Sequence, residues 1–69
     1  MRTNEQVVRD ANELARKFYS MNGCKVKKGF NFESSCHPQE RLMWDMAVKA
    51  YEVIDGTDVD DALADIEDA

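Results

Sequence analysis

The sequence predicts a small all-α protein with three helices in a single domain spanning residues 1–69. Two observations lead to this prediction. Apolar residues recur every three or four positions along three segments, which is the repeat of an amphipathic helix. Residues that begin or end helices stand at the limits of the same segments. We expect two antiparallel amphipathic helices, a short acidic third helix, and a long ordered connection between the first two.

The first helix is expected at residues 4–21. Thr3 and Gln6 have the spacing of a capping box, in which each side chain accepts a hydrogen bond from the other residue's backbone N–H. Asn22 and Gly23 follow the segment, and both tolerate the left-handed conformation that often ends a helix. One apolar stripe is expected to face the core, and it consists of Val7, Val8, Ala11, Leu14, Ala15 and Phe18.

Residues 22–37 form a connection of sixteen positions, which is long for a compact domain. Phe30 and Phe32 alternate within it, as side chains do along an extended chain. We therefore expect a few extended residues here, with one or both rings packed on the core.

The second helix is expected at residues 38–55. Pro38 suits the first helical turn, where its missing N–H is not needed, and Gly56 ends the segment. The predicted buried stripe consists of Leu42, Met43, Met46, Ala47, Ala50, Tyr51 and Ile54.

Trp44 and Val48 lie beside that predicted stripe, and two interpretations are open. In the first, Trp44 packs under the Phe30/Phe32 segment. In the second, Trp44, Val48 and a methionine form an exposed patch of the kind found at the centre of protein–protein contacts. Because so small a domain has little core of its own, we favour the second interpretation, as the seam of a homodimer.

The third helix is short, and Thr57 is expected to cap it. Asp58, Asp60 and Asp61 fall in its first turn, where the helix dipole favours negative charge. A narrow apolar edge should fold back on the core through Val59, Ala62, Leu63 and Ile66.

Charge is divided unevenly along the chain, whose net charge is −5. The last fifteen residues carry seven carboxylates and no Lys or Arg, whereas the first 28 carry seven Lys or Arg against three Asp or Glu. Such a run usually means a solvated helix face. The alternatives are an electrostatic guide for a partner, or a mimic of nucleic-acid phosphates that docks on a basic groove. The aspartates in question repeat at a helical spacing: Asp58, Asp61, Asp65 and Asp68.

Residue types give little support for catalysis or for a bound cofactor or metal. Cys24, Cys36 and His37 are the only soft metal ligands, fewer than the four of a structural zinc site. Neighbours in sequence, such as Cys36 and His37, seldom have the geometry of a nucleophile and its base. The sequence contains no phosphate-binding, dinucleotide-binding or zinc-protease motif. We predict no enzyme activity, no metal and no cofactor.

Nucleic-acid binding and membrane insertion are also disfavoured. A pI near 4.6 is far from the basic surface expected of a DNA-binding domain, although a dimer that joins its basic ends would be an exception.

No apolar run is long enough to span a bilayer, and the polar start of the chain is unlike a signal peptide. We expect a protein of the cytoplasm, with reduced thiols.

The sequence resembles the small early-operon proteins of lambda-like bacteriophages, encoded by short reading frames between the exonuclease and excisionase genes. Three segments carry the resemblance: M-N-G at 21–23, H-P-Q-E at 37–40 and D-V-D-D-A-L-A-D at 58–65. It implies a non-enzymatic accessory role in host takeover or in the choice between lysis and lysogeny. No catalytic residue carries over from this family.

Together these features predict a small protein-binding accessory protein, acting as an early modulator of a host or phage regulatory protein in the bacterial cytoplasm. A DNA-mimic inhibitor and a dimeric DNA-binding regulator stay open as alternatives. The residues expected to contact the partner are Trp44, Val48, Asp58, Asp61, Asp65 and Asp68.

Overall fold

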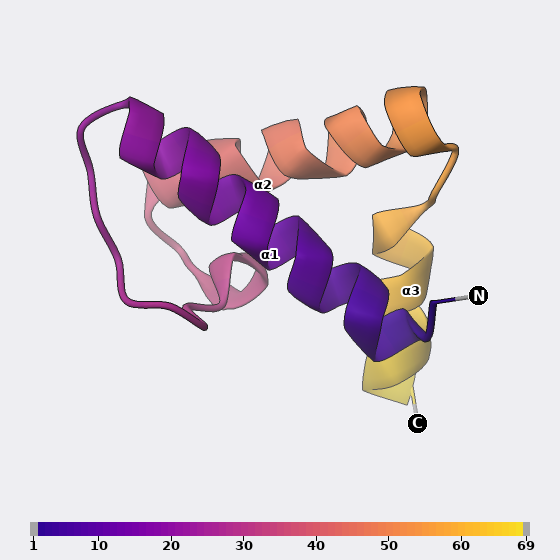
Figure 1. The fold of residues 1–69 in the computed structure, drawn as a ribbon. Coiled ribbons are helices and arrows are strands. Elements are labelled where there is room, and N and C mark those ends of the chain that lie inside the picture. Colours follow the sequence, from indigo (N-terminus) through magenta and orange to yellow (C-terminus); the bar gives the residue numbers. More distant parts are fainter. Residues whose placement is uncertain (1, 69) are drawn as a thin grey trace.

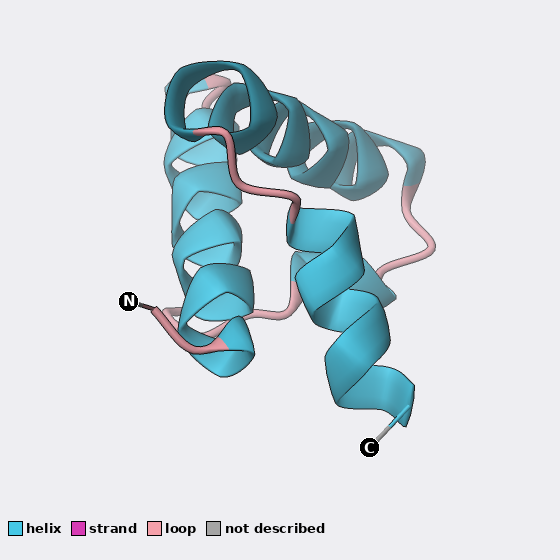
Figure 2. Ribbon diagram, turned by 90° about the vertical axis from the view of Figure 1, so that its right-hand side faces the viewer, coloured by secondary structure: helices cyan, strands magenta, loops and turns pink. Residues whose placement is uncertain are grey.

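A computed structural model describes residues 2–68, and within this range all regular structure is helical. The all-α prediction is therefore confirmed. Helix α2 leads back from the connection at an angle to α1, and α3 then packs against the N-terminal part of α1 (Figures 1 and 2). The elements in chain order are α1 (Asn4–Met21), the 3₁₀ turn η1 (Phe32–Ser34), α2 (Pro38–Ala50), the π-helical turn η2 (Tyr51–Asp55) and α3 (Val59–Asp68).

Helix α1 begins and ends where the sequence predicts. The Thr3 hydroxyl accepts a hydrogen bond from the Gln6 backbone N–H at 3.2 Å, and the Thr3 N–H donates to Gln6 Oε1 at 2.8 Å. At the other end Gly23 has φ of +84°, a left-handed conformation that costs glycine little. Both local signals were strong enough to fix the limits of the helix.

Helix α2 begins as predicted but does not stay α-helical to its expected end. His37 caps it, because His37 Nδ1 accepts from the Gln39 N–H at 3.3 Å, and Pro38 is the first residue. After Ala50 the chain forms the π-helical turn η2, whose i→i+5 hydrogen bonding adds a residue to the turn. The side chains that follow are therefore displaced around the helix from the positions that a 3.6-residue period predicts. Gly56, with φ of +70°, ends the segment.

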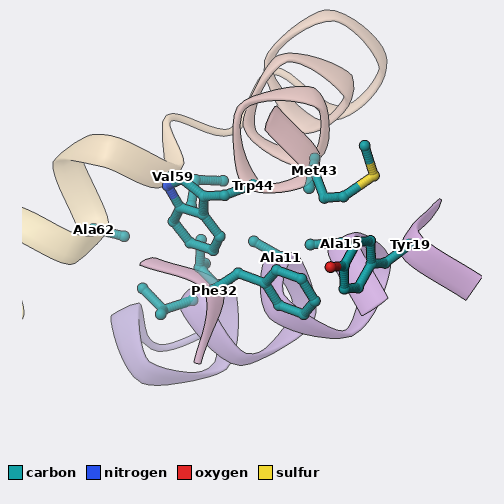
Figure 3. Packing of buried hydrophobic residues seen from close by; sticks show 11 residues of the cluster. Ala11, Ala15, Tyr19, Phe32, Met43, Trp44, Val59 and Ala62 are labelled. Atoms are coloured by element: carbon teal, nitrogen blue, oxygen red, sulfur yellow. The ribbon is translucent and has the colours of Figure 1, made fainter. Parts of the chain in front are cut away.

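The core lies where α1, α2, α3 and η1 meet (Figure 3). Ala11 and Ala15 of α1 and Ala47 of α2 have no exposed area, and such small residues let the two helices approach closely. Two aromatic side chains fill the space around them, and Trp44 is only 2% exposed while Phe32 is fully buried. Aromatic side chains remove large apolar areas from water, so burying these two contributes strongly to the stability of so small a chain.

The burial of Trp44 corrects two expectations about α2. Trp44 does not lie in an exposed patch, and Val48, which is half-buried, packs against the core. Conversely, Leu42, Met46 and Ile54 of the predicted buried stripe are exposed. Met43, Ala47 and Tyr51 of the predicted stripe do face the core, so the buried side of α2 overlaps the predicted one but is turned towards Trp44 and Val48. The residues of this buried side are Met43, Trp44, Ala47, Val48 and Tyr51.

The connection between α1 and α2 is held by a buried asparagine that the sequence analysis missed. Asn12 Oδ1 accepts from the Phe32 backbone N–H at 2.6 Å, and Asn12 Nδ2 donates to Glu33 Oε2 at 2.8 Å. Arg41 of α2 donates to the Glu33 carbonyl at 2.9 Å.

The expected packing of a phenylalanine on the core is confirmed for Phe32, whose ring meets that of Tyr19 edge-on, with the ring centroids 5.8 Å apart. The segment is a 3₁₀ turn there, rather than extended chain.

Helix α3 has a different cap from the one predicted. The Asp58 carboxylate accepts from the Asp61 N–H at 3.0 Å, so Asp58 rather than Thr57 caps the helix. Thr57 instead donates its hydroxyl to Asp55 Oδ2 at 2.6 Å. Threonine and aspartate are both good caps, so adjacent candidates cannot be ranked from sequence alone. The apolar edge of α3 folds onto the core as expected, with Val59 and Ala62 buried.

Candidate protein-interaction surface

The outer side of α2 and η2 exposes a row of large apolar side chains. Leu42 is 53% exposed, Met46 41%, Val53 74% and Ile54 85%. Leu42, Met46 and Ala50 follow one another every four residues and form a stripe along α2, and Val53 and Ile54 of η2 extend it beyond the end of the helix. We call Leu42, Met46, Ala50, Val53 and Ile54 the outer face. Apolar side chains exposed side by side, unlike single ones, mark interaction surfaces.

The outer face continues into two open hollows between α2–η2 and α1. One, of about 360 Å³, is lined by Phe18 of α1 together with Met46, Lys49, Ala50, Val53 and Ile54. The other, of about 300 Å³, is lined by Arg2, Leu14, Ala50, Tyr51, Ile54 and Asp55. Since Ala50 and Ile54 line both hollows, the two are neighbours and form one apolar groove. Leu14 and Phe18 supply its wall on α1.

The π-helical turn explains why Ile54 is outside the core. Ile54 comes seven residues after Ala47, which is about two turns of an α-helix. A regular α-helix through residue 55 would therefore place Ile54 on the same side as Ala47. The wider turn of η2 moves it away from that face, and Ile54 becomes the most exposed large apolar side chain among residues 2–68. Single π-helical turns within helices are frequently found at functional sites.

An arginine near the start of the chain closes one end of the groove. Arg2 forms ion pairs with Asp10 of α1, at 3.1 Å, and with Asp55 of η2. Its guanidinium also lies over the Tyr51 ring, 5.4 Å from the centroid, where the aromatic face attracts a cation. The hydrogen bond to Asp10 raises the pKa of Arg2. The hydrogen bond from Thr57, and then the charge of Arg2, lower the pKa of Asp55.

Charged residues border the stripe of the outer face along one flank. Asp45 precedes Met46 and Lys49 precedes Ala50, so both lie on the same flank of the stripe, one turn apart. Lys49 pairs with Glu52 at 3.3 Å, and all three side chains are exposed. Within the described part of the chain, Asp45 has no ion-pair partner.

The four aspartates of the predicted acidic stripe are exposed on α3. Asp58 is engaged as the helix cap, and Asp65 accepts from the Asn4 side chain at 3.4 Å. Asp61 and Asp68 make no side-chain hydrogen bond among those found for residues 2–68. The stripe is thus a charged surface on a different element from the outer face.

The residues considered for metal binding or nucleophilic chemistry are dispersed over structural positions. Cys24 is half-buried against the core, and Cys36 is exposed. His37 Nδ1 is occupied as an acceptor at the start of α2. Among residues 2–68, no three His, Cys, Asp or Glu side chains gather closely enough to hold a metal ion.

None of the helices described for residues 2–68 combines the length and the apolar character that crossing a membrane requires. No protein-family model, curated protein or solved structure matches this chain.

Proposed function

We propose that this protein is a non-enzymatic interaction module whose outer face is covered by another polypeptide chain when it works. The observation that carries the proposal is the exposed apolar row Leu42, Met46, Val53 and Ile54 beside the groove to α1. Covering such side chains is favourable by about 25 cal/mol per Å² of apolar area removed from water. An extended groove between two helices also suits a helix better than a small compact ligand.

The class of partner follows from the resemblance to phage early proteins. In that setting the final target is a host or phage regulatory protein in the bacterial cytoplasm. The exposed aspartates of α3 would then guide the encounter, because charge complementarity raises association rates and selects partners more than it adds affinity. A DNA mimic has less support, since Asp58 and Asp65 are already engaged within the chain.

Site-specific photo-crosslinking in cells that produce the protein tests this function. A photo-reactive amino acid replaces Met46 on the outer face and, in a matched control, Arg9, which is exposed on α1. We expect a crosslinked product of higher mass from position 46 and none from position 9. Mass spectrometry then identifies the attached chain.

The proposal is wrong if position 46 yields no product that position 9 lacks. Circular dichroism of both variants establishes that they are folded, so that a missing product reports on binding and not on structure.

A further inference from the structure

We propose that the chain covering the outer face is a second copy of the same protein, bound in an antiparallel, two-fold symmetric arrangement of α2 and η2. This inference rests on the proposed function and names its first partner. It moves the homodimer seam from Trp44, which is buried, to the row of exposed apolar residues on the opposite side of α2.

The stripe on the outer face is self-complementary. A two-fold axis between Met46 and Ala50 places Met46 opposite Ala50 of the second copy, and Leu42 near Ile54. A long side chain then meets a small one on each side of the axis, which allows the two helices to pack closely. Side chains repeating every four residues form ridges of the kind that interdigitate between packed helices. A two-fold interface requires such a patch, because the same surface must serve both copies.

The charges beside the stripe are complementary in the same arrangement. A two-fold axis perpendicular to antiparallel helices brings the same flank of each copy together. Asp45 and Lys49 occupy that flank one turn apart, so Asp45 of each copy would lie within one helical turn of Lys49 of the other, which would share its ammonium group between Asp45 and its own Glu52. This pairing gives Asp45 the ion-pair partner that it lacks within residues 2–68. It occurs twice, once on each side of the axis.

The size of the chain also favours a second copy. A 69-residue chain buries a smaller share of its surface than a larger domain does, and oligomerisation is one of the usual ways to add core. Pairing two copies would combine α1 and α2 of each into a four-helix arrangement, with Leu14 and Phe18 of the groove at its edge. The acidic face of α3 stays open for a regulatory partner.

Charge reversal combined with sedimentation equilibrium tests the inference. We expect the wild type to dimerise, and Asp45→Lys or Lys49→Asp alone to raise the dimer dissociation constant about tenfold, since each reversal acts at both pairs. The double variant Asp45→Lys/Lys49→Asp exchanges the charges and should restore dimerisation. Glu67→Lys and Lys27→Asp change the same charges at exposed sites elsewhere and should leave the dissociation constant unchanged.

Three results would overturn the inference: a protein that is monomeric up to about 1 mM, a dimer that neither single reversal weakens, or a double variant no better than the singles. A monomer whose position 46 crosslinks to a different chain would refute the dimer alone and leave the interaction module intact. Absence of any crosslink at position 46 would refute both.

Discussion

The two sides of α2 carry similar side chains in opposite surroundings. On the inner side Met43, Trp44 and Ala47 are buried against α1 and α3, whereas on the outer side Leu42 and Met46 are exposed. A helical repeat of apolar residues therefore identifies a helix, but not which of two apolar sides the fold buries. The inner side stabilises the single chain, and the outer side is left for a partner.

Truncation of one residue on each side should give the largest contrast. Trp44→Ala removes the largest side chain of the core, and we expect it to lower the free energy of unfolding by about 3–5 kcal/mol. Ile54→Ala, in dilute monomeric protein, should change it by no more than about 0.5 kcal/mol. Urea denaturation measures both. Equal losses for the two variants would mean that the inner and outer sides have been wrongly distinguished.

The contact that ties the connection to the core should have the next largest effect. Asn12→Ala leaves the buried Phe32 N–H without its acceptor, at a cost of about 1–3 kcal/mol in the free energy of unfolding. Asn31→Ala is the matched control, because Asn31 is exposed and its side chain does not cap η1. Hydrogen exchange of the Phe32 amide should become faster in Asn12→Ala. An unchanged exchange rate would contradict the role given to Asn12.

Sequence reasoning succeeded where a signal is local. Thr3 and Gln6 fixed the start of α1, and Gly23 and Gly56 fixed two helix ends, because each acts through backbone atoms a few residues away. It failed where the outcome depends on distant parts of the chain. The burial of Trp44 rather than Leu42 depends on how α2 packs against α1 and η1, which lie far from it in the sequence.

The residues of the candidate surface were not predicted. An exposed apolar patch on the second helix was expected around Trp44 and Val48, whereas Leu42, Met46 and Ile54, which are exposed, were expected in the core. The displacement of Ile54 comes from η2, and no local signal in the sequence marks a π-helical turn. The contact between Arg2 and Asp55 joins residues at opposite ends of the chain, so it too is visible only once the chain is folded.

The smallest expected effect concerns pH at the charged end of the groove. The lowered pKa of Asp55 means that its ionised form is favoured by folding. Its contribution to stability is complete above the pKa of an unfolded aspartate, about 3.9, and disappears as the pH falls through the lower pKa of the folded protein. Asp55→Asn should therefore make stability depend less on pH in this acidic range, as followed by thermal unfolding. Glu67→Gln is the control, and an identical pH dependence of the Asp55→Asn variant and the wild type would exclude this role for Asp55.

Methionine methyl NMR with a soluble paramagnetic agent tests most directly whether the outer face is covered by a second copy. Met43 lies on the inner side of α2 and Met46 on the outer side, so the two methyl groups report on both sides in one spectrum. We expect the Met43 signal to be protected at every protein concentration, and the Met46 signal to be broadened in dilute protein and protected in concentrated protein. A Met46 methyl that is broadened equally at both concentrations would contradict the account.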